Sequence, residues 1–165
     1  MAKRNILTKE QPGLYKKSRQ VTEFNPRLHQ LLDDMRETLE TANGVGLAAP
    51  QVGVLRRAVI VLETNVPEEE DEYIIELINP EIIETEGEQE GAEGCLSVPG
   101  EFGLVKRPMR VKVRAQDRFG NSFEVEGEGL TARCFCHEID HLEGIVFTSK
   151  AERMLSEEEL ESGEY

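Results

Sequence analysis

The sequence predicts an α+β domain in which antiparallel β-strands pack around a central helix, with one helix before the strands and a short helix at the C-terminus. Three observations indicate this order. Apolar residues recur at helical spacing between residues 28 and 39 and alternate with polar residues at 111–115, and a second helical segment at about 131–142 runs up to a glycine. Helix, strands and helix in this order are typical of the α+β class.

The first helix has the clearest sequence signals. Asn25 can cap it through its side chain, and Pro26 suits the first helical position. Its buried face is expected to consist of apolar residues at helical spacing: Leu28, Leu31, Leu32, Met35 and Leu39. Gly44 and Gly46 are expected to end the helix, because glycine readily adopts the left-handed conformation that closes many helices.

Two apolar segments are expected to form strands after this helix. Segment 58–62 is β-branched and apolar, and segment 73–79 is similar in composition. Pro80 is expected to stop the second of these strands, because proline cannot donate a ladder hydrogen bond.

A β-hairpin and two helices are expected in the second half. Segment 111–115 alternates apolar and basic residues, and a turn at 117–121 leads into a returning strand at 122–128. The second helix is expected at 131–142. Ser156 and Glu159 resemble a capping box, which predicts a short C-terminal helix. With no internal repeat or linker, residues 1–165 are expected to form one domain.

Composition limits the function of the chain. It has 33 acidic and 19 basic residues, and the resulting net charge of −14 argues against nucleic-acid binding. No apolar run approaches the roughly 20 residues that span a bilayer, and the N-terminus lacks the apolar stretch of a signal peptide. We therefore expect no membrane association and a cytoplasmic location. The acidic segments 67–72 and 157–164 are interpreted as solvated surface.

The pentapeptide H-E-I-D-H at 137–141 is the strongest candidate for chemistry. Residues four apart lie on one face of a helix, so His137 and His141 can direct their imidazoles at one metal ion. Glu138 projects beside them and can reach a water molecule on that ion as a general base. The alternative is a pair of ordinary surface histidines on a polar helix.

The third metal ligand is open on local grounds. An odd number of cysteines in a cytosolic chain does not suggest a disulfide framework. Cys95 lies in an expected loop flanked by glycines, and can approach the helix or be a small buried residue. Cys134 shares the helix face of the histidines, whereas Cys136 points away from it. Phe147 stands where metzincin proteases have a third histidine, which excludes that class.

Three segments together resemble the peptide deformylase family: G-V-G-L-A-A-P-Q at 44–51, E-G-C-L-S at 93–97 and H-E-I-D-H-L-E-G at 137–144. The resemblance covers most of the chain, and three ordered motifs are highly specific. It implies that Cys95, His137 and His141 hold one divalent metal ion, natively Fe²⁺, with Zn²⁺, Ni²⁺ or Co²⁺ as possible ions in a purified form.

The resemblance also implies roles for other residues. The Gln51 side chain and the Leu96 N–H would stabilise an oxyanion, and the backbone near Gly46 would position the substrate. Cys134 would lie near a pocket for methionine. The implied reaction is removal of the formyl group from N-formylmethionyl nascent peptides near the ribosome, with release of formate. Cys136 departs from the family, which often has glutamine there, and the acidic C-terminus excludes ribosome docking through a basic extension.

Two other functions are compatible with the metal motif. A small zinc endopeptidase would cleave peptides internally, and Glu159 or Glu161 lies near the spacing at which gluzincin proteases place their third ligand. A non-catalytic metal-binding module would have a closed site of four ligands and no catalytic water.

Overall fold

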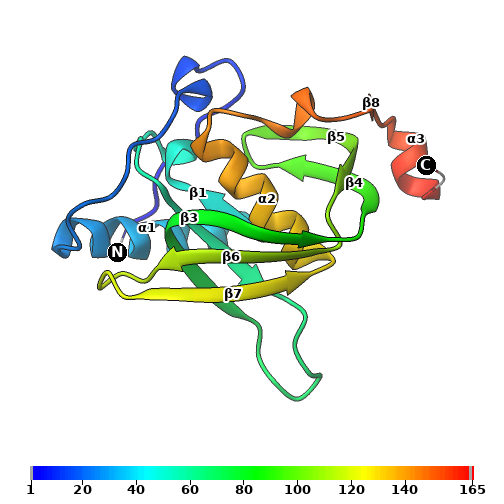
Figure 1. The fold of residues 1–165 in the computed structure, drawn as a ribbon. Coiled ribbons are helices and arrows are strands. Elements are labelled where there is room, and N and C mark those ends of the chain that lie inside the picture. The colour runs from blue at the N-terminus through cyan, green and yellow to red at the C-terminus, as the bar shows by residue number, and fades with distance from the viewer. Residues whose placement is uncertain (1, 164) are drawn as a thin grey trace.

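Two antiparallel sheets form the framework of the computed structural model, which describes residues 2–163 and 165. The larger sheet has the order β1-β2-β3-β6-β7, with bounds Gly46–Ala48, Ala58–Glu63, Tyr73–Glu86, Arg110–Gln116 and Ser122–Glu128. The smaller sheet has the order β4-β5-β8, with bounds Gln89–Cys95, Val98–Arg107 and Arg153–Met154. Helix α2, Leu130–Leu142, lies between them (Figure 1). The predicted combination of antiparallel strands and helices is confirmed.

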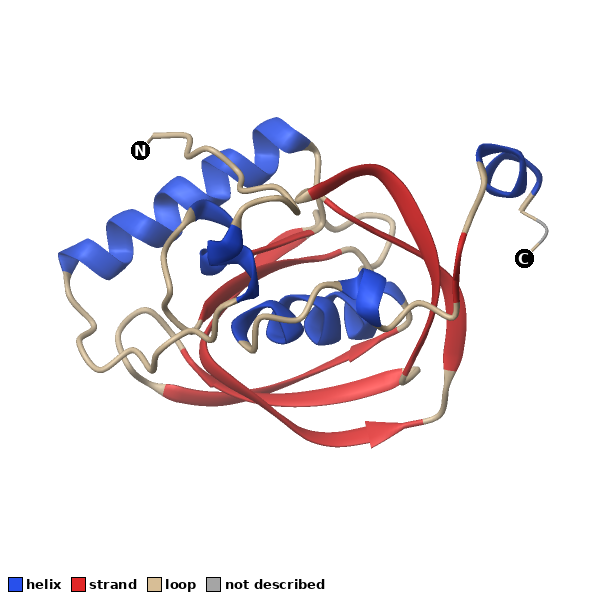
Figure 2. Cartoon of the chain, turned by 90° about the horizontal axis from the view of Figure 1, so that it is seen from above, coloured by secondary structure: helices blue, strands red, loops and turns tan. Residues whose placement is uncertain are grey.

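Helix α2 packs its apolar side against the concave face of the larger sheet (Figure 2). Phe135 is fully buried there, together with Ala132 and Leu142. Val59 and Val61 of β2 belong to the same cluster, as do valines of β6. The helix that carries residues 137–141 is thus fixed by a core on one side, which leaves its other side for the smaller sheet.

Helix α1, Pro26–Ala42, covers the opposite face of the larger sheet (Figure 2). Its predicted apolar residues all lie in this second core, where Ala58 and Ile60 of β2 contact them. Because side chains alternate along a strand, β2 contributes to both cores and is apolar throughout. The predicted cap is confirmed, since the Asn25 side chain accepts a hydrogen bond from the Leu28 N–H at 3.1 Å.

The predicted end of α1 needs a correction. The left-handed residue is Asn43, at φ 54°, so the helix ends before the two glycines that were expected to close it. Asparagine is the side chain that most readily replaces glycine in this conformation.

Strand β3 contradicts the prediction that Pro80 stops it, because it continues to Glu86. The strand pairs with β2 up to Ile78 and with β6 beyond, and its register with β6 shifts between Ile78 and Glu81. Asn79 has a φ of 52° at this shift. The proline therefore lies in an irregularity where no ladder N–H is required, which is the setting in which sheets tolerate it.

The β4–β5 hairpin was not predicted, and Cys95 is the last residue of β4 rather than part of a loop. Glycine and glutamate are frequent in β4, and both weigh against a strand by propensity. Packing explains Gly94, because a Cβ atom there would lie 2.5 Å from Cε1 of Phe102. The hairpin covers a third small core around Leu14 and Phe147.

The remaining elements match the expected positions. Strands β2, β6 and β7 and helix α2 occupy the predicted segments. Helix α3, Glu157–Ser162, begins with the predicted capping box of Ser156 and Glu159 and lies at the edge of the molecule (Figure 1). Three short 3₁₀ helices complete the chain, η1 at Pro12–Tyr15, η2 at Ala49–Val52 and η3 at Phe147–Ser149. In the described chain, no helix combines the length and apolarity that a membrane crossing requires.

The core between α2 and the larger sheet makes a stability prediction. Phe135→Ala is expected to lower the free energy of unfolding by about 3–5 kcal/mol, because it leaves a cavity at a fully buried position. The matched control is Phe119→Ala. Phe119 is 68% exposed, so this variant should lose little unfolding free energy. Urea unfolding of both variants measures the difference, and equal losses would contradict the packing described here.

Candidate metal centre

Three potential metal ligands meet between α2 and the end of β4. His137 and His141 lie one helical turn apart on α2, and both are buried. The Cys95 sulfur is 3.3 Å from Nε2 of His141. One ligand atom from each of the three residues lies within 4.8 Å of the others. The structure therefore brings Cys95 to the two histidines, as the resemblance implied.

Glu93 orients one of the two imidazoles. Its Oε2 atom lies 2.6 Å from Nδ1 of His137, which leaves Nε2 of that ring for a metal ion. Arg107 binds Glu93 through two hydrogen bonds of 3.0 and 2.6 Å, and Arg133 donates a third of 2.9 Å. Burial disfavours the carboxylate charge, but the bonds from His137 and Arg107 outweigh burial and hold the pKa of Glu93 well below its usual range. Glu93 therefore stays ionised.

Glu138 lies beside the cluster and is 4% exposed. Its Oε1 atom is buried and has no hydrogen-bond partner among the described residues. Burial raises the pKa of this carboxyl to about 7, although the neighbouring His137 acts to lower it. Gly46 of β1 makes room for the carboxylate, because a Cβ atom there would lie 2.6 Å from Oε2 of Glu138.

Gln51 lies on helix η2, and its side chain reaches the cluster at Cys95. Its Oε1 atom accepts a hydrogen bond from the Ala48 N–H at 2.9 Å, which fixes the orientation of the amide. The amide nitrogen then points to the Cys95 sulfur at 3.5 Å and to the Ser97 hydroxyl at 3.1 Å. Gln51 is 1% exposed, so this donor is held in place at the edge of the candidate metal centre.

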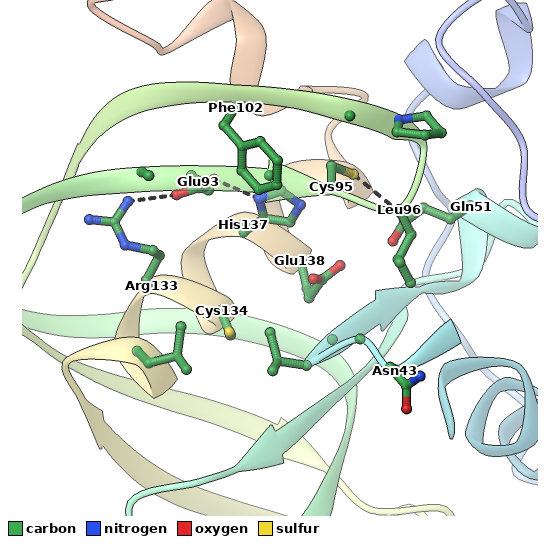
Figure 3. A pocket seen from close by; sticks show the side chains of 18 residues that line it. Asn43, Gln51, Glu93, Cys95, Leu96, Phe102, Arg133, Cys134, His137 and Glu138 are labelled. Atoms are coloured by element: carbon green, nitrogen blue, oxygen red, sulfur yellow. Dashed lines mark hydrogen bonds and ion pairs between the residues drawn. The ribbon is translucent and has the colours of Figure 1, made fainter. Parts of the chain in front are cut away.

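The cluster opens on a cavity of about 450 Å³ (Figure 3). Leu96, Phe102 and Cys134 lie around it, together with Glu138 and His137. Burial raises the pKa of the Cys134 thiol, so this cysteine stays protonated on the cavity wall. A largely apolar cavity with a few buried polar groups at its base is typical of a small-ligand site.

The donor set fits a divalent metal ion. A thiolate and two imidazoles are borderline-soft ligands that suit Zn²⁺ and Fe²⁺, and three protein ligands leave a position open for water. The unpartnered oxygen of Glu138 belongs to a side chain that lines the same cavity as Cys95 and His137. Cys136, which was expected to point away, is buried in the core between α2 and the larger sheet.

Glu93, Ser97 and Phe102 had no role assigned from the sequence, although Glu93 and Ser97 lie at the two ends of the E-G-C-L-S segment. Histidine ligands commonly donate their second ring N–H to a carboxylate, so a partner for His137 could have been sought. Helical spacing around His137 does not show which acidic residue is its partner, and the position of Glu93 in the quoted 93–97 segment is the one sequence signal that points to it. That assignment depends on the β4–β5 hairpin, which has no clear sequence signal.

A helix with two histidines and a glutamate, completed by a cysteine from a neighbouring hairpin, defines a candidate metallohydrolase centre. The family model for polypeptide deformylase matches residues 3–157 of the chain. A peptide deformylase of Caldicellulosiruptor bescii is 56% identical over 161 residues, which cover 98% of this chain and 93% of the relative. The chain belongs to the polypeptide deformylase family.

Solved structures agree with this assignment. The peptide deformylase of Thermotoga maritima matches with a TM-score of 0.85 and 36% identity, covering 92% of this chain and 99% of the other. The Met-ala-ser-bound class I type b peptide deformylase of Acinetobacter baumannii matches with a TM-score of 0.82 and 35% identity, covering 90% and 98%.

The two candidate cysteines can be separated by metal content. Cys95→Ala is expected to lose the bound metal ion, because its sulfur lies in the cluster. Cys134→Ala is the matched control and should retain the metal, since its thiol lines the cavity outside the cluster. Elemental analysis of the two purified variants measures the stoichiometry. Metal loss in the second variant alone would show that the wrong cysteine was chosen.

The contact of Gly46 with Glu138 gives a second prediction. Gly46→Ala is expected to displace the carboxylate and lower kcat/KM by about 10²-fold, because small misplacements of reacting groups are costly. Gly13→Ala is the control, since a methyl group there meets only Leu7 at 3.4 Å. Steady-state rates and metal content are measured for both. A rate close to wild type would mean that Glu138 is not confined by Gly46.

Proposed function

We propose that this chain carries out the reaction of its family with one divalent metal ion held by Cys95, His137 and His141. The reaction is hydrolysis of the formyl group from the N-terminal formylmethionine of newly made polypeptides, with formate as the second product. The observation that carries the proposal is the cluster of these three ligands at the base of a cavity, beside the buried Glu138.

The family resemblance favours Fe²⁺ as the ion in the cell, with Zn²⁺, Ni²⁺ or Co²⁺ as substitutes in purified protein. The mixed sulfur and nitrogen donors of the cluster are compatible with all four ions. When bound, such an ion would lower the pKa of a water molecule and provide a nucleophile near neutral pH.

Side chains and backbone groups of the chain would transfer the proton and stabilise the developing negative charge. Glu138 accepts the proton of the attacking water and passes it to the leaving amine. Negative charge develops on the formyl oxygen, where the amide N–H of Gln51 and the backbone N–H of Leu96 donate hydrogen bonds. The bond between Gln51 Oε1 and the Ala48 N–H supports this role, because it turns the NH₂ group toward the cluster.

The substrate is proposed to lie in the cavity of Figure 3 with its methionine side chain near Cys134. The apolar wall that includes Leu96 and Phe102 suits a thioether side chain. The backbone near Gly46 would align the peptide at the entrance. A tripeptide that begins with methionine is bound in the Acinetobacter baumannii relative, which supports a peptide with methionine first as the ligand.

The wider setting of the reaction is also part of the proposal. We take residues 1–165 as a single catalytic domain whose central helix α2 carries the H-E-I-D-H motif. The proposed location is the cytoplasm, near the ribosome, where formylated chains emerge. The first turn of helix α3 is acidic, so docking through a basic C-terminal extension is not part of the proposal.

Formate release from formyl-Met-Ala-Ser tests the reaction directly. Protein purified without oxygen and loaded with Fe²⁺ or Ni²⁺ is expected to release one formate per peptide. The unformylated peptide should remain intact. Internal cleavage of either peptide would indicate an endopeptidase, and bound metal without any turnover would indicate a structural module.

Glu138→Ala tests the proton-transfer role. It is expected to retain the metal ion and lose a factor of about 10²–10⁴ in kcat, because general-base catalysis contributes this range. The control is Glu161→Ala, which removes an exposed acidic residue of α3. Formate release and metal stoichiometry are measured for both variants. Substantial turnover in the first variant would assign the proton transfer to another group.

A further inference from the structure

A second cavity lies beside the first turns of α1, where residues 19–23 and Val54 and Arg56 approach that helix. Its volume is about 660 Å³, and it shares no lining residue with the cavity of the metal centre. Four arginines line it, Arg4, Arg19, Arg27 and Arg56, against a single carboxylate, Glu23. This concentration of positive charge is unexpected in a chain with a net charge of −14.

Three of the four arginines of this cavity differ from all others in the described chain. Every arginine outside the cavity forms an ion pair with a carboxylate. Arg4 pairs with Asp34 at 3.0 Å. In the part of the chain that the structure describes, Arg19, Arg27 and Arg56 form no ion pair. Glu23, the nearest candidate partner by location, instead accepts a hydrogen bond from Asn25.

Two of these arginines are held side by side by the backbone. Arg19 and Arg56 form a parallel β-bridge. The Arg19 N–H donates to the Leu55 carbonyl at 3.1 Å, and the Arg57 N–H donates to the Arg19 carbonyl at 2.9 Å. Bridge partners lie roughly 5 Å apart with their side chains on the same side, and like charges in this arrangement are destabilising. An anion bound between the two guanidinium groups would remove this repulsion.

The other features of the cavity suit a compact anion. Helix α1 begins at its rim with Asn25 and Arg27, so the positive end of the helix dipole adds to the arginine charge. A guanidinium group can bind a phosphate through two parallel N–H···O hydrogen bonds. Val21, Leu31 and Val54 supply an apolar floor. The volume is that of a small-ligand site, and the acidity of the whole molecule disfavours a long nucleic acid.

We propose that this arginine cavity is a binding site for an oligophosphate, with Arg19, Arg27 and Arg56 as the phosphate ligands. The ligand is either a free oligophosphate or the phosphate chain of a nucleotide whose base rests on the apolar floor. The site is separate from the metal centre and is independent of the deformylation reaction.

Calorimetric titration of the metal-loaded protein with inorganic triphosphate and with GTP tests the proposal. Saturable binding of one ligand per chain is expected in phosphate-free buffer of low ionic strength. Arg19→Gln with Arg56→Gln should weaken binding by about tenfold or more, because each charge-assisted hydrogen bond contributes on that scale. Equal affinities would assign a free oligophosphate, and tighter binding of GTP would assign a nucleotide.

The matched control is Arg110→Gln with Arg114→Gln, which removes the same charge from exposed, ion-paired positions of β6. This variant should bind as the wild type does. Metal content is measured after each titration, because triphosphate chelates divalent ions, and thermal unfolding verifies that both variants fold. Absence of saturable binding, equal weakening in both variants, or tighter binding of a single-stranded RNA than of either ligand would overturn the proposal.

Discussion

The burial of α2 between two sheets is the constraint on which the rest of the structure depends. Only Leu130, Ile139 and Asp140 of this helix are not buried. One side of the helix must therefore be apolar to pack on the larger sheet, while the other must place imidazoles and a carboxylate in a space that water scarcely reaches. Desolvation is what makes these groups useful, because electrostatic interactions strengthen as the local dielectric falls.

Burying these charged groups lowers the free energy of unfolding unless each charge has a hydrogen-bonded partner of opposite charge. Glu93 is the central residue of this buried network, since it accepts hydrogen bonds from His137, Arg107 and Arg133. Arg107 extends the network to Asp140 at 2.8 Å. A buried ion pair contributes little net stability but fixes a geometry, and removal of one partner is strongly destabilising. We interpret the network as the device that holds the His137 ring in one orientation.

Local sequence patterns predicted the parts of the fold that depend on local physics. The N-cap of α1, the capping box of α3 and the alternation in β6 and β7 are short-range features, and all are present. The β4–β5 hairpin depends instead on contacts between distant residues, such as Phe102 packing on Gly94, and composition gave no sign of it. Pro80 was misleading for the same reason, because the irregularity that accommodates it is created by pairing with β6.

The same distinction between short-range and long-range features applies to the candidate site. Residues 137 and 141 could be paired from helical spacing alone, whereas the choice among three cysteines required the resemblance to a family. The roles of Gln51 and Leu96 also came from that resemblance, and the structure places both residues at the cavity. The contact between Glu93 and His137 and the arginine cavity were not anticipated, because each joins segments that lie far apart in the chain.

Strand β4 carries both Glu93 and Cys95, and each contacts a histidine of α2 although the register with β5 shifts between Gly94 and Cys95. One hairpin strand thus supplies both a candidate metal ligand and the carboxylate that orients a second candidate ligand. Inserting or deleting one residue between Glu93 and Cys95 would separate the sulfur from the carboxylate, and a thiolate near His141 would no longer coincide with an oriented His137 ring.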